Sequence, residues 1–382
     1  MASTSASNTS TTELENEIND SQLNDSVYRF YHGPNPEMAI IFFHDMYWRK
    51  DEKPHLIWRS RTNPSVCWPQ KWLPEEYPNS QILSIHYSAS IQKTSTDGHM
   101  DLFLIGENLY QDILQKCAAN CPIFLVGHGA GGLVIKKVIV AMKDALPLDE
   151  PNKTREYSFL KNVKGIFYYS TPHSGLYGAS WIKCLPECLL SPLLDTLQVL
   201  STPTSRLNQT FEIWRQGTKC KTFAILAAGQ TKVCLCWYTH IVEEASARVG
   251  SDNIYTDQES DHFNVCKPTS RTHGSYMMLV KFIRSQKEAT SSQEEMPTNS
   301  NVPPSTKDNA ETYWKNYVAQ ILNGRYLKEG FMLAREDAEE IQRFVEVWDS
   351  LERGLKENGL RFEYADSNQY VWKPVTFDVI CV

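Results

Sequence analysis

The residues that could do chemistry are framed most clearly in the stretch IFLVGHGAGG, residues 123–132. An apolar run that passes through a glycine-rich turn into a helix is the setting of the G-x-S-x-G motif, which exposes a serine hydroxyl as a nucleophile. Position 129, at the centre of the motif, is glycine. The pattern therefore indicates the turn that presents a nucleophile, but without the hydroxyl.

The same stretch has a second interpretation, a phosphate cradle. Backbone amides at the start of a helix can bind a phosphate group. However, the stretch lacks the GK[ST] of a phosphate-binding loop and the acid expected of a dinucleotide site. The rest of the chain agrees better with the nucleophile turn.

The elements that must position this turn are predicted by apolar patterning. Helices are predicted by apolar positions at three- and four-residue steps from Leu102 to Ile113 and from Leu133 to Met142, the second with a partly basic flank. The alternation of strands and helices predicts an α/β fold, with a mostly parallel central sheet, helices on both faces and right-handed crossovers. Four short apolar or β-branched runs predict strands that are covered on both faces: residues 39–43, 81–85, 122–126 and 163–169.

Composition divides the chain into four parts. Residues 1–25 are rich in Ser, Thr, Asn and acids and predict a disordered tail. Residues 26–284 hold the α/β domain, and residues 285–311, rich in Ser, Gln, Glu, Pro and Asn, predict a flexible linker. Residues 312–382 predict a small C-terminal helical segment.

The C-terminal segment is predicted from a short apolar stripe. Its apolar residues recur at helical spacing from Ala338 to Leu355, before a stop at Asn358 and Gly359. The stripe favours a docking face against the domain or a protein partner over a freestanding coiled coil, because the pattern is short. The final residues, YVWKPVTFDVICV, are expected to form a strand or a packed tail.

Charge and cysteine usage exclude several classes of protein. The chain of 382 residues has a net charge of -7, which argues against a nucleic-acid surface. Ten cysteines without an apolar signal segment indicate free thiols in a reducing compartment, so an intracellular, cytoplasmic location is expected. The close cysteine pairs lack the spacing of a zinc site, so no metal or cofactor is predicted. No apolar run reaches the roughly 18 residues of a membrane-spanning helix, so no transmembrane segment is expected.

Four stretches together resemble the serine active site-containing protein family, α/β-hydrolases that are lipase-like and associated with phospholipid remodelling at mitochondria and endoplasmic reticulum. The resemblance covers residues 39–284 in the family's order and implies an α/β-hydrolase fold and a peripheral location near those membranes. It is carried by these stretches: WPQKWLPEEYPNSQILSIHYSAS, GHGAGGLVIKKVIV, GIFYYSTPHSGLYGASW and HIVEEASARVGSDNIYTDQESDHFNVCKP.

The resemblance assigns site residues position by position. The family's nucleophile falls on Gly129 and its base on His262, the one catalytic member that is retained. The His-Gly turn that helps to place the oxyanion-hole amide is replaced by His44 and Asp45, which brings a carboxylate close to where an oxyanion would form. The family's glutamate aligns with Ala227, which leaves three candidate substitute acids: Glu243, Glu244 and Asp261. The resemblance also places His128, Ala130 and Ser174 at the oxyanion site or pocket.

Two classes of function remain open at this point. Loss of the nucleophile costs a triad enzyme about six orders of magnitude in rate, which favours a degenerate hydrolase that binds a lipid or acyl ligand or acts as a regulatory protein or scaffold. The alternative is an active ester or lipid hydrolase. It would use a displaced nucleophile, Ser174 beside His173 being a stronger candidate than Ser170 or Cys121, or a water activated by His262 or His128.

Aromatic residues are plentiful in the insertion after the first predicted strand. They could line a lipid pocket, or they could pack a lid against the core, since large aromatic side chains serve both purposes. The residues are Tyr47, Trp48, Trp58, Trp68 and Trp72.

Overall fold

Seven strands form the central sheet of the computed structural model, in the order β1-β3-β2-β4-β5-β6-β9. Six of them are parallel, and β1 pairs antiparallel with β3 at one edge. The strands are β1 (Val27–His32), β2 (Met38–Phe43), β3 (Ser80–Ile85), β4 (Ile123–His128), β5 (Val163–Tyr169), β6 (Lys221–Ala227) and β9 (Asn253–Asp257). The structure describes residues 22–47, 57–89, 102–147, 149–176, 202–234, 237–294, 360–365 and 369–374.

All four predicted strands are present, as β2, β3, β4 and β5, so the expected α/β fold is confirmed. Alternate side chains of each strand enter two different cores because successive residues of a strand point to opposite faces. In β2, Ile41 and Phe43 pack in one core, whereas Ile40 and Phe42 pack in the other. Burial on both faces explains why these strands read as continuous apolar runs.

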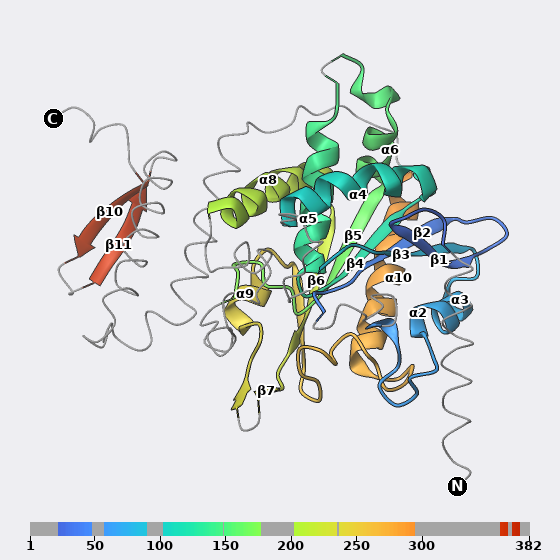
Figure 1. Cartoon of the computed structure of the whole chain (residues 1–382). Coiled ribbons are helices and arrows are strands. Elements are labelled where there is room, and N and C mark those ends of the chain that lie inside the picture. The colour runs from blue at the N-terminus through green and yellow to red at the C-terminus, as the bar shows by residue number, and fades with distance from the viewer. Residues whose placement is uncertain are drawn as a thin grey trace, which may run out of the picture.

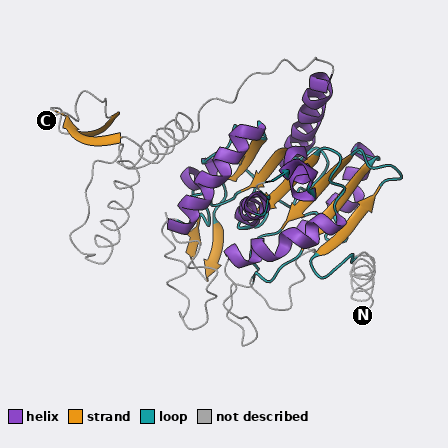
Figure 2. Ribbon diagram, turned by 90° about the horizontal axis from the view of Figure 1, so that it is seen from above, coloured by secondary structure: helices purple, strands orange, loops and turns teal. Residues whose placement is uncertain are grey.

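Helices cover both faces of the sheet (Figures 1 and 2). The two helices predicted from periodicity are confirmed as α4 and α5. One core lies under α4 (Leu102–Lys116), α5 (Gly131–Asp144), α6 (Arg155–Asn162) and α8 (Thr202–Thr218). The other lies under α2 (Trp68–Lys71), α3 (Leu73–Glu76) and α10 (Gly274–Glu294). Smaller elements complete the described chain: η2 (Pro151–Lys153), α9 (Glu244–Arg248) and the hairpin of β7 (Thr231–Cys234) and β8 (Trp237–Thr239).

The tryptophans of the insertion pack into the core wherever their side chains are described. Trp58 and Trp68 are both fully buried in the core under α10, and their rings contact Phe42 of β2 edge-on at 4.9 and 5.5 Å. The Trp68 indole donates a hydrogen bond to the carbonyl oxygen of Cys266 at 3.0 Å. Trp72 is partly buried against the same core, and Trp48 lies outside the described residues. These aromatics therefore serve packing.

Helix α10 crosses the predicted boundary between the domain and the linker. Helix α10 continues through residues 285–294, the start of the predicted linker, because the chain keeps its helical hydrogen bonding after the last core contact at Ile283. Within the predicted C-terminal helical segment, β10 (Leu360–Ala365) and β11 (Gln369–Pro374) form an antiparallel pair. The apolar stripe between Ala338 and Leu355 lies outside the described residues, as does the tail up to residue 21. No helix among the described residues is long and apolar enough to cross a membrane.

Candidate active site

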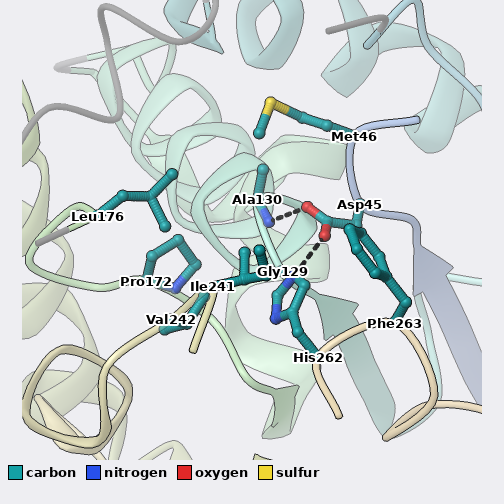
Figure 3. Close-up of a pocket in the computed structure, with 10 residues that line it drawn as sticks. All are labelled: Asp45, Met46, Gly129, Ala130, Pro172, Leu176, Ile241, Val242, His262 and Phe263. Carbon is teal, nitrogen blue, oxygen red and sulfur yellow. Dashed lines mark hydrogen bonds and ion pairs between the residues drawn. The ribbon is translucent and has the colours of Figure 1, made fainter. Parts of the chain in front are cut away.

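Sheet register brings two distant segments together at the carboxyl ends of β2 and β4. The two strands are parallel neighbours, with Phe43 opposite Gly127, so the residues that follow each strand leave the sheet side by side. Asp45 follows β2, and Gly129 follows β4. The loop after β9 brings His262 to the same place, as Figure 3 shows. This edge of a parallel sheet is where α/β proteins place their ligand sites.

The turn after β4 keeps the geometry of a nucleophile elbow. Gly129 has a φ of 52°, the left-handed backbone conformation that a side chain tolerates only at a cost. Its amide donates to the carbonyl oxygen of Tyr169 at 2.9 Å, which ties the turn to β5. At Gly127, an added Cβ would lie 2.7 Å from Cα of Gly132, so that glycine is required for the close contact of strand and helix. The fold itself therefore requires the glycines of this turn.

The Asp45 carboxylate fills the space in front of Gly129. An added Cβ at residue 129 would lie 2.1 Å from Cγ of Asp45 and 2.2 Å from both of its carboxylate oxygens. Oδ1 accepts a hydrogen bond from the amide of Ala130 at 2.7 Å, and Oδ2 accepts one from Nε2 of His262 at 2.7 Å (Figure 3). In a hydrolase with this elbow, the amide after the nucleophile is an oxyanion-hole donor, and the base faces the nucleophile. The Asp45 carboxylate therefore occupies both the position of the oxyanion and the position of the nucleophile side chain.

The Asp45 carboxylate is ionised at neutral pH. Burial alone would raise its pKa, but the hydrogen bond and charge of His262, the charge that His128 acquires in the acid range and the amide of Ala130 together lower the pKa to about 2. An ionised carboxylate only accepts hydrogen bonds, so Nε2 of His262 must carry the proton that it donates. A triad base needs an unprotonated Nε2 to take the proton of its nucleophile. This arrangement is therefore incompatible with general-base action by His262 at the elbow.

The other ring nitrogen of His262 has no acid beside it. Nδ1 is buried and without a hydrogen-bond partner among the described residues, whereas a triad would place a carboxylate there. Ala227, which the resemblance aligned with the missing glutamate, ends β6. The three substitute acids lie in other contacts: Glu243 is the N-cap residue of α9, Glu244 pairs with Arg248, and Asp261 accepts from the amide and side chain of Asn264.

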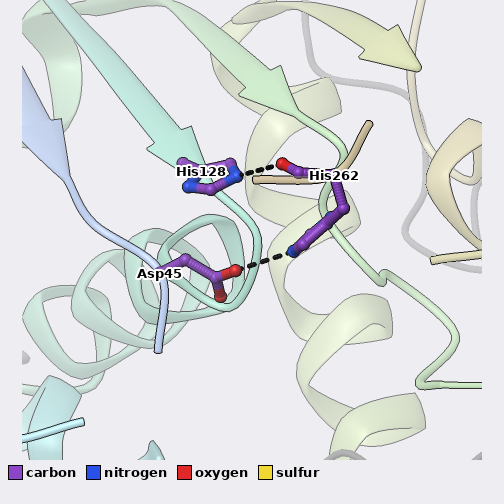
Figure 4. A group of neighbouring side chains, drawn as sticks. All are labelled: Asp45, His128 and His262. Carbon is purple, nitrogen blue, oxygen red and sulfur yellow. Dashed lines mark hydrogen bonds and ion pairs between the residues drawn. The ribbon is translucent and has the colours of Figure 1, made fainter. Parts of the chain in front are cut away.

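Two further histidines support the site through backbone contacts. Nε2 of His128 donates to the carbonyl oxygen of His262 at 2.8 Å, which holds the His262 loop over the elbow (Figure 4). Nδ1 of His44 donates to the carbonyl oxygen of Asp45 at 2.6 Å, and the His44 ring stacks on Tyr87. Burial lowers the pKa of both histidines to about 4, so each is neutral at physiological pH.

The displaced nucleophiles considered from the sequence lack a base. Among the described residues, the buried Ser174 hydroxyl has no hydrogen-bond partner, and neither ring nitrogen of the adjacent, buried His173 has one. Ser170 uses its hydroxyl oxygen to accept from the amide of Ala227 at 2.9 Å. The Cys121 thiol donates to a backbone carbonyl, and burial raises its pKa, which keeps it in the unreactive thiol form. None of these groups has the paired base that activates a nucleophile.

Asp45, His128 and His262 also form the one cluster among the described residues that could hold a metal ion. Their ligand atoms lie within 4.8 Å of one another, and all three side chains are buried (Figure 4). Binding a divalent ion at about 2.1 Å per ligand would require the Asp45–His262 hydrogen bond to open. Nδ1 of His262 also lacks the outer acceptor that orients a metal-bound imidazole. The cluster as it stands fits a hydrogen-bonded pair better than a metal centre.

A small pocket opens above the carboxylate. Asp45, Gly129, Ala130 and His262 line it together with apolar side chains that sequence patterning did not identify. The enclosed space is small, with room for about one water molecule, and the pocket is partly open to solvent. The apolar side chains come from four segments that only the fold brings together, so no local pattern signals them: Met46, Pro172, Leu176, Ile241, Val242 and Phe263 (Figure 3).

Comparison with known proteins identifies relatives of this chain. It is 27% identical over 232 residues to Protein SERAC1 of Danio rerio, covering 59% of this chain and 34% of that protein. It is 24% identical over 292 residues to Protein SERAC1 of Homo sapiens, covering 71% of this chain and 43% of that protein. The chain thus spans less than half the length of the curated relatives that it matches. No protein-family model matches the sequence.

The solved structures that this chain matches at low similarity include lipases. Phospholipase PlaB from Legionella pneumophila is 10% identical with a TM-score of 0.46, and covers 89% of this chain and 69% of its own. A monoacylglycerol lipase from Paleococcus ferrophilus is 12% identical with a TM-score of 0.40, and covers 68% of this chain and 99% of its own. The sheet order and the glycine elbow after β4 give this chain the α/β-hydrolase fold, and part of its sequence is similar to the serine active site-containing protein SERAC1.

Proposed function

We propose that this chain is a catalytically degenerate, lipase-like α/β-hydrolase that binds a lipid or acyl ligand in a regulatory or scaffolding role. The observation that carries the proposal is the position of the Asp45 carboxylate, 2.1–2.2 Å from where a side chain on residue 129 would begin. A nucleophile and this carboxylate exclude each other sterically. Glycine at 129 and aspartate at 45 are therefore sterically linked features of the site.

The hydrogen bonds made by the rings of His262 and His128 support the same proposal. The alternative, an active hydrolase with a displaced nucleophile or an activated water, needs one of these rings to accept a proton. Nε2 of each ring is engaged as a donor, and Nδ1 of each is buried without a partner among the described residues. A water therefore has no exposed imidazole lone pair from which to gain activation.

Hydrolysis of p-nitrophenyl butyrate and palmitate, together with labelling by a fluorophosphonate, tests the loss of catalysis. We expect the wild-type protein to match His262→Ala in both assays, with turnover at the background level and no label. Turnover or labelling that is lost in His262→Ala would overturn the proposal and establish a working enzyme.

Ligand binding supports the second half of the proposal and needs its own test. Six apolar side chains surround the polar floor of the pocket, a lining of the kind that contacts alkyl or acyl chains. Protein purified without detergent would be extracted with organic solvent and the extract examined by mass spectrometry. We expect a stoichiometric lipid, and a wild-type protein that neither retains nor takes up any lipid would refute the binding role.

The proposal also covers the location of the chain in the cell and its protein partner. The resemblance to a family associated with mitochondria and endoplasmic reticulum supports a peripheral place beside those membranes, and the apolar stripe between Ala338 and Leu355 supports a protein partner. Imaging of a tagged chain against markers of both organelles tests the location. Deletion of residues 312–382 should release the partner if the stripe binds it, while ligand binding to the domain persists.

A further inference from the structure

The polar floor of the pocket is closed to an incoming anion. In an active hydrolase, the amide after the nucleophile binds the oxygen of the substrate carbonyl or of the product carboxylate. Here that amide, of Ala130, donates to Oδ1 of Asp45 at 2.7 Å, and Nε2 of His262 donates to Oδ2 at 2.7 Å. The amide of Gly129 is bonded to Tyr169 at 2.9 Å. These three donors are all used by the protein itself.

The occupant of the oxyanion site is also charged and dry. The side chain of Asp45 is 6% exposed and that of His262 is 5% exposed, so their charge distribution is screened little by solvent. A ligand carboxylate that entered to the depth of the elbow would lose its hydration, would meet no free donor among these groups and would face the Asp45 carboxylate. A hydroxyl or ester head group carries no charge and can remain at the pocket mouth at a smaller cost.

We propose that the pocket selects uncharged amphiphiles, such as a fatty alcohol or a neutral acyl ester, and discriminates against the fatty carboxylate of the same chain length. Asp45 thereby acts as a specificity-determining residue and serves as an internal substitute for the anion that an active relative would bind at this point. The inference rests on the proposed ligand-binding function, because it specifies which ligands that function admits.

The test compares 1-decanol with sodium decanoate by isothermal titration of the full chain at pH 8, below the critical micelle concentration. We expect the wild-type protein to bind decanol at least tenfold more tightly than decanoate. Asp45→Asn retains the size of the side chain and an oxygen for the amide of Ala130, and removes the charge. We expect it to reduce the preference for decanol over decanoate at least tenfold.

Asp144→Asn is the matched control, since it removes one carboxylate from the exposed end of α5, the helix that begins at the elbow. It should leave the selectivity of the wild type unchanged. Equal affinities for the two ligands in the wild type, or tighter binding of decanoate, would overturn the selectivity while leaving the binding function intact. If neither ligand binds, both proposals fail. The wild-type comparison decides the point even if Asp45→Asn does not fold.

Discussion

The carboxylate of Asp45 and the missing side chain of Gly129 compete for the same space. An added Cβ at residue 129 would lie 2.1 Å from Cγ of Asp45, well inside van der Waals contact, and the φ of 52° at residue 129 matches the strained conformation of an elbow nucleophile. Glycine at 129 is therefore a condition for aspartate at 45. The carboxylate accepts the hydrogen bonds that an oxyanion would accept at this point.

Restoring serine alone should destabilise the protein. We expect Gly129→Ser to lower the free energy of unfolding through backbone strain and through overpacking against Asp45, each about 1–3 kcal/mol. Adding Asp45→Gly to Gly129→Ser should recover the part of the unfolding free energy that is lost through overpacking. Urea denaturation of the two single variants and the double variant gives the coupling energy directly.

Gly250→Ser is the control for strain without a clash. Gly250 also has a positive φ, 71°, but an added Cβ there would meet only Oε2 of Glu212 at 3.9 Å. The loss of unfolding free energy in Gly250→Ser should approximate the part of the loss in Gly129→Ser that comes from backbone strain. Equal losses at positions 129 and 250, or the absence of coupling with Asp45→Gly, would contradict the steric competition.

Reactivity should return only when the carboxylate is removed. We expect fluorophosphonate to label Asp45→Gly/Gly129→Ser and not Gly129→Ser alone, because the double variant frees the amide of Ala130 and Nε2 of His262. Adding Ala227→Glu, at the position aligned with the family's acid, should raise the labelling rate at least tenfold by giving His262 an acid partner. His262→Ala in the double variant should abolish labelling, and labelling that persists there would show that another base acts.

The depressed pKa of Asp45 predicts a specific loss of stability in acid. An unfolded aspartate titrates near 3.9, whereas the folded carboxylate has a pKa of about 2, so the unfolded state binds more protons between these values. The stability that Asp45 contributes is complete above about pH 4 and is lost as the pH falls toward 2. Urea denaturation between pH 5 and 2 should show a steeper decline for the wild type than for Asp45→Asn. Parallel declines would contradict the assigned pKa.

The buried Lys136 predicts a second rise of stability with pH, in the alkaline range. Its ammonium donates to Asn208 at 2.7 Å and lies 5.2 Å from the ring centroid of Phe211, and burial lowers its pKa to about 7. The unfolded lysine stays protonated up to about pH 10.4, so stability should rise as the pH increases from 7 to 10.

Replacement of Lys136 separates its contribution to the pH dependence of stability from that of the other titratable groups. Lys136→Met should abolish its share of the slope between pH 7 and 10 and should increase stability near pH 7, where a buried charge is costly. Lys143→Met, at the exposed end of the same helix, is the control and should leave the slope in place. A slope that is unaffected by Lys136→Met would show that the folded protein does not penalise this charge.

Local patterning determined the sheet and the elbow. Short runs such as residues 163–169 predict buried strands because burial on both faces requires apolar side chains at every position. The turn at residues 127–131 is predicted because its glycines permit a positive φ and a close contact between strand and helix. The basic residues of α5 suggest an exposed flank, but Lys136 is only 3% exposed. The periodicity of the sequence does not reveal that α8 packs against α5.

Only the tertiary structure decided what the altered residues do together. The sequence has Gly129 and Asp45 where the resemblance implies a serine and the glycine of a His-Gly turn, as two separate departures, but Asp45 is 85 residues from Ala130 and 217 residues from His262. Their contact depends on the parallel pairing of β2 with β4 and on the loop after β9, which no local pattern encodes. The proton on Nε2 of His262 follows from that contact as well, because a hydrogen bond to an ionised carboxylate requires a donor.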